Sequence, residues 1–235
     1  MIFDATGIEE TIGYVFNDKM LLRKCFTHSS YGNEHGEDNN ELLEFFGDAV
    51  IEYIVTEYLF KNAFGDEGKL TAKRAEIVSK SPLLNVVKRL GLDKYVLLGK
   101  GQEKTKTQDE KLFSSVYEAL VAGIYLDGGI VKAKRFVKNT LIKDYERGEQ
   151  RKLKIKTDAK AKSEFQEYVQ KRHIGSVGYE VLNRTGPDHL PEFRVAALLN
   201  GGRIAEAKGA SIQAAEAAAA AEALAKLKKQ DGKKN

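Results

Sequence analysis

The 235-residue sequence has a single cysteine, Cys25, and no long apolar run. One cysteine excludes a disulfide scaffold and a four-cysteine zinc site, and it is typical of a reducing compartment. The longest uncharged, strongly apolar segment, residues 119–126, is far too short to span a bilayer. The N-terminus carries Asp4, Glu9 and Glu10 where a signal peptide needs basic and then apolar residues. We therefore expect a cytoplasmic protein without membrane association.

Apolar residues make up 42% of the chain and charged residues 31%, a composition that supports a packed core and excludes wholesale disorder. The net charge of +4 is unevenly divided: residues 1–150 carry 21 basic and 24 acidic side chains, whereas residues 151–235 carry 17 and 10. Within the first part, residues 31–60 contain eight acids and no lysine or arginine. Acidic segments attract cations and basic segments attract phosphate, so the sequence predicts two modules with different tasks.

The first module, residues 1–147, is predicted to be all-helical, because no stretch of it alternates apolar and polar residues for long. An amphipathic helix is expected from Asn40 to about residue 64. Another is expected to begin with Gly68-Lys-Leu-Thr71, where the hydroxyl of Thr71 suits an N-cap before Ala72. Residues 148–157 are charged and lack apolar periodicity, so they are predicted to form a basic linker.

The second module, residues 158–229, has a different pattern. A helix over residues 162–172 is followed by three short segments typical of strands, and Asn200-Gly-Gly between the last two predicts a hairpin turn. An alanine-rich helix then ends the module, and residues 230–235 are expected to be a disordered tail. The predicted fold is thus an all-α domain followed by a small α+β domain with the order α-β-β-β-α.

Three carboxylates line one stripe of the helix after Asn40: Glu41, Glu44 and Asp48 stand at positions i, i+3 and i+7. Their repulsion costs helix stability, so either a cation or solvent must compensate, and the spacing alone leaves both interpretations open. Carboxylate oxygens suit a hard ion such as Mg²⁺. A fourth acid, Glu118, lies in an apolar helix, where it needs a partner. Gly47 indicates either room for an approaching backbone or close helix packing.

The ribonuclease III family has a highly specific signature, which the sequence resembles at Asn40-Glu-Leu-Leu-Glu-Phe-Phe-Gly-Asp-Ala-Val50. Other blocks of that family are resembled, in the expected order, at Phe26-Thr-His-Ser-Ser-Tyr31, Glu67-Gly-Lys-Leu-Thr-Ala-Lys-Arg74 and Tyr117-Glu-Ala-Leu-Val-Ala-Gly-Ile-Tyr-Leu-Asp-Gly-Gly129. The second module resembles the double-stranded-RNA-binding domain of the same family, through Glu164-Phe-Gln-Glu-Tyr168, Gly186-Pro-Asp-His189 and the alanine-rich helix. The resemblance covers nearly the whole chain.

This resemblance implies an endoribonuclease that hydrolyses double-stranded RNA to 5′-phosphate and 3′-hydroxyl ends, in the processing of ribosomal, messenger and other RNA. It implies Asp48 and Glu118 as catalytic residues, Glu44, Asp48, Ser115 and Glu118 as metal ligands, and Glu41 close to the metal. The implied ion is Mg²⁺, with Mn²⁺ as the alternative, and no organic cofactor is expected. A homodimer is expected as well, since one cluster cuts one strand and two related by symmetry cut both.

In the second module, the resemblance implies that Gln166, Glu167, His189 and Lys208 contact RNA, whose A-form shape, 2′-hydroxyls and phosphates such modules recognise. Where the family usually has two consecutive basic residues, this chain has Ile212-Gln213, a change that should weaken RNA binding. The basic linker is a candidate for compensating that loss.

The nuclease module also departs from the family, because Ser115 replaces the usual aspartate and is a poorer metal ligand. We expect an active enzyme with a weaker metal site. The alternative is a catalytically weak or inactive double-stranded-RNA-binding protein that has kept the fold.

Overall fold

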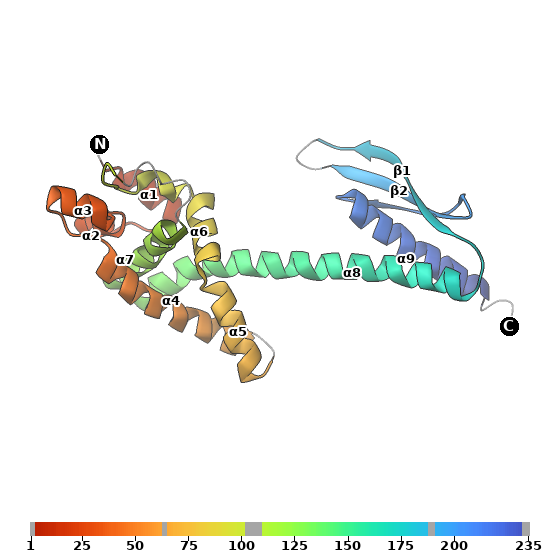
Figure 1. The fold of residues 1–235 in the computed structure, drawn as a ribbon, viewed down its shortest axis with the longest axis horizontal. Coiled ribbons are helices and arrows are strands. Elements are labelled where there is room, and N and C mark those ends of the chain that lie inside the picture. Colours follow the sequence, from red (N-terminus) through yellow and green to blue (C-terminus); the bar gives the residue numbers. More distant parts are fainter. Residues whose placement is uncertain (1–2, 63–64, 102–109, 188–190, 232–235) are drawn as a thin grey trace. The chain divides into compact units, whose positions relative to one another are not determined.

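The computed structural model describes residues 3–62, 65–101, 110–187 and 191–231, and it forms two compact units, Met1–Arg147 and Gly148–Asn235 (Figure 1). In these described ranges, no helix is both long enough and apolar enough to cross a membrane.

The first unit is helical over its described length, as the sequence predicts. The only extended pairing seen there is an isolated bridge between Thr27 and Leu97. Its elements are α1 (Ala5–Ile12), α2 (Lys19–Cys25), α3 (Ser29–His35), α4 (Glu41–Asn62), α5 (Glu67–Ile77), α6 (Lys80–Arg89), the 3-10 turn η1 (Leu92–Tyr95), α7 (Glu110–Val137), the π-helical turn η3 (Lys138–Ile142) and the start of α8 (Lys143–Lys171).

Helix α5 begins earlier than predicted. Its N-cap is Asp66, whose carboxylate accepts a hydrogen bond from the Lys69 backbone N–H (2.9 Å). Thr71 therefore lies inside the helix and does not cap it. The aspartate is the better cap here, because its charge is also favourable at the positive end of the helix dipole.

Helices α4 and α7 pack against each other at the centre of the first unit (Figure 1). They cross at Gly47, where an added β-carbon would lie only 1.9 Å from the carbonyl oxygen of Glu118. The absence of a side chain lets the two backbones approach this closely. Val116 and Leu120 of α7 are completely buried in the surrounding core. The structure thus confirms close helix packing as a role of Gly47.

Helix α8 runs through residues 148–157, the predicted linker, without a break. Its first turns are fixed in the first unit, where Asp144 pairs with Arg89 (2.8 Å) and Glu146 accepts a hydrogen bond from Tyr58 (2.7 Å). After Gly148, the segment contains good helix formers and no further glycine or proline, so its lack of apolar periodicity does not prevent helix formation.

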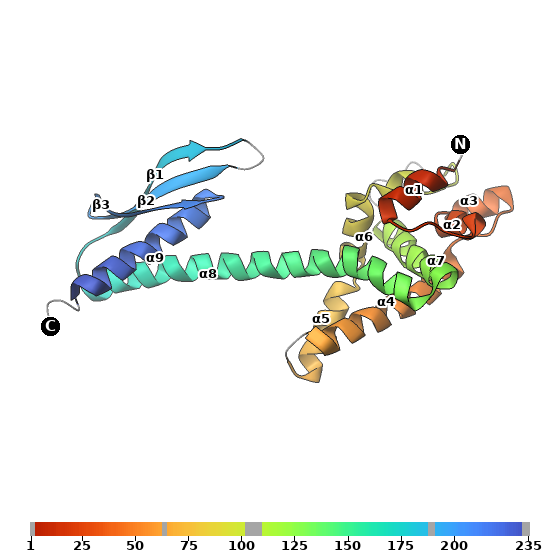
Figure 2. The same ribbon diagram turned by 180° about the vertical axis from the view of Figure 1, so that it is seen from behind.

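The second unit contains an antiparallel sheet of β1 (Val177–Thr185), β2 (Glu192–Leu199) and β3 (Gly202–Gly209) in the order β1-β2-β3, followed by α9 (Ile212–Asp231). The hairpin predicted at Asn200-Gly-Gly is confirmed: Leu199 pairs with Gly202, and Asn200 and Gly201 both have positive φ. Figure 2 shows α9 alongside the sheet.

The core of the second unit lies between the sheet and the two helices α8 and α9. Phe165 of α8 is fully buried against Ala197 of the sheet and the alanine face of α9. The small alanine side chains of α9 allow this helix to lie close to the strands. Asp231, the last residue of α9, binds Tyr168 and Arg172 of α8. The helix therefore includes the first two residues of the predicted tail, and residues 232–235 lie outside the described ranges.

Candidate active site and nucleic-acid interface

The crossing of α4 and α7 brings acidic residues of the two helices together. Glu44 and Asp48 lie on either side of Gly47 in α4, and the backbone of Glu118 in α7 contacts that glycine. Burial is the largest cause that raises the pKa of Glu118, and the negative charges of Glu44 and Asp48 also contribute, so that the pKa lies at about 8. The structure therefore places these three predicted residues close enough to interact electrostatically.

Glu44 is half-buried, and burial raises the pKa of its carboxyl above the ordinary range. Lys111 and Lys80 oppose this shift in pKa, whereas Glu41 and Asp48 add to it. Glu41 is the exposed first residue of α4, and its backbone N–H donates to the side chain of Asn39 (3.0 Å).

Sequence reasoning missed the two lysines beside these acids. Lys111 lies seven residues before Glu118, a spacing that places both on one face of α7 and could have revealed it. Lys80 is the first residue of α6 and is remote from the acids in sequence, so only the packing of α6 against α7 brings its charge near Glu118. The cluster thus combines carboxylates with two exposed cations at its edge.

Ser115, the residue in place of the usual aspartate, is buried one turn before Glu118 on α7. Its hydroxyl donates a hydrogen bond to the carbonyl oxygen of Leu112 (2.9 Å). This local bond uses the only hydroxyl proton and leaves the oxygen lone pairs as acceptors or ligands. A serine here therefore contributes an oxygen atom but no negative charge.

The donor set suits a hard divalent ion. The acids offer carboxylate oxygens only, and the raised pKa of Glu118 reports an excess of negative charge around a poorly solvated group, which a cation would relieve. Among the residues that the structure describes, no three His, Cys, Asp or Glu side chains are gathered in a metal-binding arrangement. Asp48 and Glu41 are exposed, so their side chains have rotational freedom to approach an ion.

The predicted RNA contacts lie in separate parts of the second unit. Gln166 and Glu167 are exposed on α8, and Glu167 lies 3.8 Å from Lys171. Lys208 is exposed on β3 and pairs with Glu192 of β2 (2.8 Å). His189 lies outside the described residues.

Gln166 borders a hollow of about 870 Å³ between α8 and the start of α9. Ser211 and Gln213 lie on the α9 side of this hollow, and the Ser211 hydroxyl accepts a hydrogen bond from the Ala214 backbone N–H (3.2 Å). Lys208 does not line it. The structure thus joins one predicted contact, Gln166, to the divergent beginning of α9.

Comparison with known proteins agrees with this two-part arrangement. Residues 18–145 match the family model described as Ribonuclease-III-like, and residues 161–227 match the double-stranded RNA binding motif. The sequence is 40% identical to ribonuclease 3 of Bacillus cereus over 227 residues, which cover 94% of this chain and 91% of the relative. Ribonuclease 3 of Bacillus anthracis is 39% identical over the same lengths.

Solved structures show the same likeness. The nuclease domain of ribonuclease III from Campylobacter jejuni, in a 2.2 Å crystal structure, matches with a TM-score of 0.55 and 31% identity, covering 61% of this chain and 97% of that one. A second structure of that domain, which describes flexibility in a region involved in dimer formation, matches with a TM-score of 0.54 and 32% identity over 58% of this chain and 98% of that one. Two domain matches in the expected order, and identity along nearly the whole chain, lead to one conclusion: the chain belongs to the ribonuclease III family of double-stranded-RNA endoribonucleases.

Proposed function

We propose that this chain is a Mg²⁺-dependent endonuclease that cleaves double-stranded RNA with Glu44, Asp48 and Glu118, assisted by Glu41 and Ser115. The observation that carries the proposal is the electrostatic coupling of Glu118 to Glu44 and Asp48 across the crossing of α4 and α7. Mn²⁺ is the alternative ion, because it accepts the same oxygen ligands. Precursors of ribosomal and messenger RNA in the cytoplasm are the proposed substrates.

In this proposal, Glu118 and its neighbours hold the ion and orient the phosphodiester. Bound Mg²⁺ supplies a Lewis acid that activates a water molecule and stabilises the leaving oxygen. Glu118, whose pKa is about 8, is mostly protonated at neutral pH without metal and must release that proton to become a ligand. Lys80 and Lys111 supply positive charge that attracts the RNA backbone to the edge of the acidic cluster.

A cleavage assay on a long RNA duplex, with Mg²⁺ and with EDTA, tests this function. We expect Mg²⁺-dependent cleavage to 5′-phosphate ends by the natural chain. Glu118→Ala should abolish cleavage and leave duplex binding intact, because the change removes a metal ligand and no RNA contact. Cleavage in EDTA would contradict the metal requirement, and parallel loss of binding and cleavage would make Glu118 structural.

The second candidate function is an RNA-binding protein that no longer cleaves. The specific observation in its favour is Ser115, which brings no negative charge and whose hydroxyl donates a hydrogen bond to the carbonyl oxygen of Leu112. Duplex binding without cleavage, at any concentration of Mg²⁺ or Mn²⁺, would support this second function over the first.

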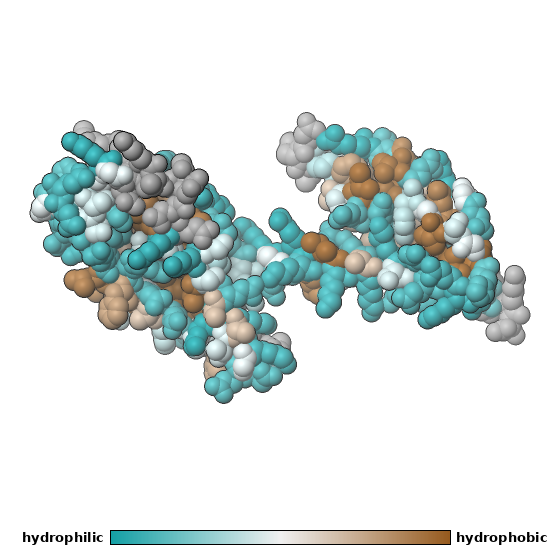
Figure 3. All heavy atoms as spheres, viewed as in Figure 1, coloured by the Kyte–Doolittle hydropathy of each residue, from teal (hydrophilic) through white to brown (hydrophobic). Residues whose placement is uncertain are grey.

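We propose further that two copies of the chain form a homodimer through the exposed apolar face of α4. Phe45 is 80% exposed, Leu42 76% and Phe60 81%, and Tyr53 is also exposed. Figure 3 shows apolar side chains gathered over the first part of this helix. Exposed apolar groups of this number on one helix are typical of an association surface.

A hollow of about 470 Å³ lies beside the end of the same helix, where Leu59, Phe60 and Leu70 supply apolar side chains. An apolar projection such as Phe45 from a second copy fits such a hollow chemically. Because a C₂ contact uses the same surface twice, one exposed aromatic residue gives two buried ones in the dimer.

Phe45→Glu should shift the mass measured by light scattering from dimer to monomer. Met20→Glu is the matched control, because Met20 is an exposed apolar residue of α2 (71% exposed) and lies on a different helix. An unchanged mass for Phe45→Glu, or an equal shift for both variants, would contradict this interface.

A further inference from the structure

One face of α8 in the second unit lines the hollow between α8 and the start of α9. The residues of this face follow the helical repeat, with steps of three and one, over about 22 Å of helix. They begin within the predicted linker and end at Gln166. The α8 residues that line the hollow are Arg151, Lys154, Ile155, Asp158, Ala159, Lys162, Ser163 and Gln166.

The three cations of this face are in different situations. Lys162 pairs with Glu216 of α9 (2.5 Å) and lies over the ring of Tyr179 (5.0 Å), so its charge holds the unit together. Arg151 and Lys154 are exposed, and within the described part of the chain neither makes an ion pair. Their charges remain available to a ligand that enters the hollow.

Among the described residues that line the hollow, those on the opposite wall include no cation. The residues of this wall at the start of α9 are small or neutral: Ala210, Ser211, Gln213 and Ala214.

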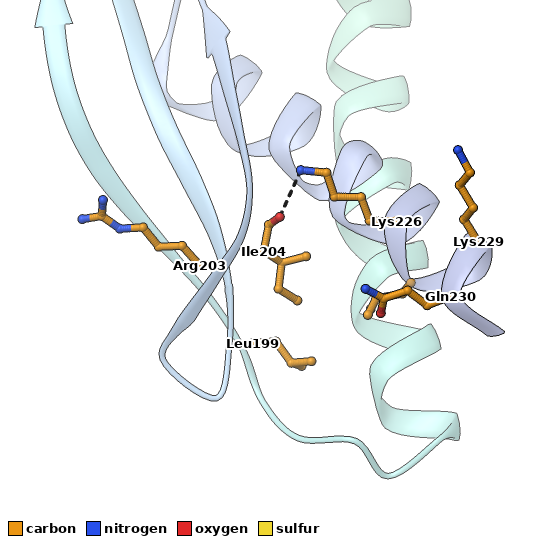
Figure 4. Close-up of a pocket in the computed structure, with 7 residues that line it drawn as sticks. Leu199, Arg203, Ile204, Lys226, Lys229 and Gln230 are labelled. Atoms are coloured by element: carbon orange, nitrogen blue, oxygen red, sulfur yellow. Dashed lines mark hydrogen bonds between the residues drawn. The ribbon is translucent and has the colours of Figure 1, made fainter. Parts of the chain in front are cut away.

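The lysines of α9 lie instead near its other end. Figure 4 shows Lys226, which donates a hydrogen bond to the carbonyl oxygen of Ile204 (3.1 Å), and Lys229, both on α9 and both lining a different pocket. Cations in the last turns of a helix suit its dipole, but these lie near the C-terminal end of α9 and do not line the hollow at its start.

We propose that Arg151 and Lys154 bind phosphates of duplex RNA at this hollow and take over the role of the basic pair that α9 lacks at Ile212-Gln213. The inference rests on duplex binding by the second unit and names new residues for it. Polar groups of Ser163, Gln166 and Ser211 share the same hollow and are suited to sugar and phosphate oxygens. The predicted linker is thereby part of the RNA-binding surface.

Salt dependence of duplex binding tests this assignment in the full-length protein. Arg151→Ala/Lys154→Ala should reduce the slope of log K against log salt by up to ~1.8, taking ~0.9 per phosphate contact from B-DNA as a guide. Lys156→Ala/Lys160→Ala removes the same charge from the same helix at positions that do not line the hollow, and it should leave the slope nearly unchanged. An unchanged slope in the first variant, or equal changes in both, would overturn the proposal.

Asp158 provides a test that loss of folding cannot imitate. It lies on the same face between Lys154 and Lys162, and its negative charge opposes phosphate binding. Asp158→Asn should therefore tighten duplex binding at low salt by about two- to fivefold, the size expected for one partly exposed charge. Weaker or unchanged binding would contradict the assignment. If the natural chain binds no duplex at all, the proposed duplex binding by the second unit is wrong. If the natural chain binds duplex and these variants bind it in the same way as the natural chain, only the assignment of Arg151 and Lys154 is wrong.

Discussion

Replacing Gly47 with alanine places a methyl group at the tightest contact between α4 and α7. The added β-carbon would lie 1.9 Å from the carbonyl oxygen of Glu118 and 2.5 Å from its carbonyl carbon. Both partners are backbone atoms of a helix, so neither can turn away as a side chain would. The two helices must therefore separate by roughly 1 Å or more to restore van der Waals contact.

This separation loosens the core at its centre, where Val116 and Leu120 are completely buried. Overpacking of this kind costs roughly 1–3 kcal/mol, and we expect the upper part of that range because backbone must move. Alanine returns up to ~1 kcal/mol through its better helix propensity. We therefore expect a net loss of about 2 kcal/mol in the free energy of unfolding, or a decrease of roughly 4–8 °C in Tm.

Thermal unfolding followed by circular dichroism measures this effect, and Gly68→Ala is the control. Gly68 lies in α5, and its added β-carbon would lie 3.6 Å from the Asp66 carboxylate, an ordinary contact. That variant should be neutral or slightly stabilised. Gly47→Ala should also cleave RNA more slowly, because the shift moves Glu118 relative to Glu44. A Gly47→Ala protein as stable as the natural chain would refute the close crossing of α4 and α7.

Three further variants test the charges of the two sites. In EDTA, Glu118→Gln should be as stable as the natural chain below pH 4.5 and more stable by about 1–3 kcal/mol above pH 8, after allowance for partial solvent screening. Because the pKa of Glu118 in the folded state is raised to about 8, the natural chain loses stability as the pH rises between these two values. A pH series of Tm in which the two proteins do not diverge would contradict the raised pKa. Ser115→Asp should lower the Mg²⁺ concentration for half-maximal cleavage by restoring a charged oxygen ligand, and an unchanged or higher concentration would show that this position does not face the ion. Ile212→Lys/Gln213→Lys should increase the slope of log K against log salt for duplex binding by up to ~1.8. The helix dipole opposes the change by roughly 0.3–1 kcal/mol per lysine. An unchanged slope would show that this end of α9 does not contact the RNA.

Local sequence patterns, together with the family resemblance that they carry, predicted the order of the elements and the residues of the proposed site. The stripe of Glu41, Glu44 and Asp48 follows from helical spacing, and the hairpin at Asn200 follows from the positive φ angles that asparagine and glycine tolerate. Such patterns are readable because they depend on neighbours within a few residues. The same locality explains the wrong cap at Thr71, since a hydroxyl before a run of helix formers has the same local appearance as a true cap.

Tertiary structure decided the properties that arise between distant segments. The raised pKa of Glu118 requires burial together with the charges of α4, and the cation Lys80 approaches that site only because α6 packs against α7. The role of residues 148–157 was decided in the same way: their composition indicated a linker, whereas one face of the helix that they continue borders the start of α9. Electrostatic potential and packing depend on distance in space, and a sequence specifies distance directly only along the chain.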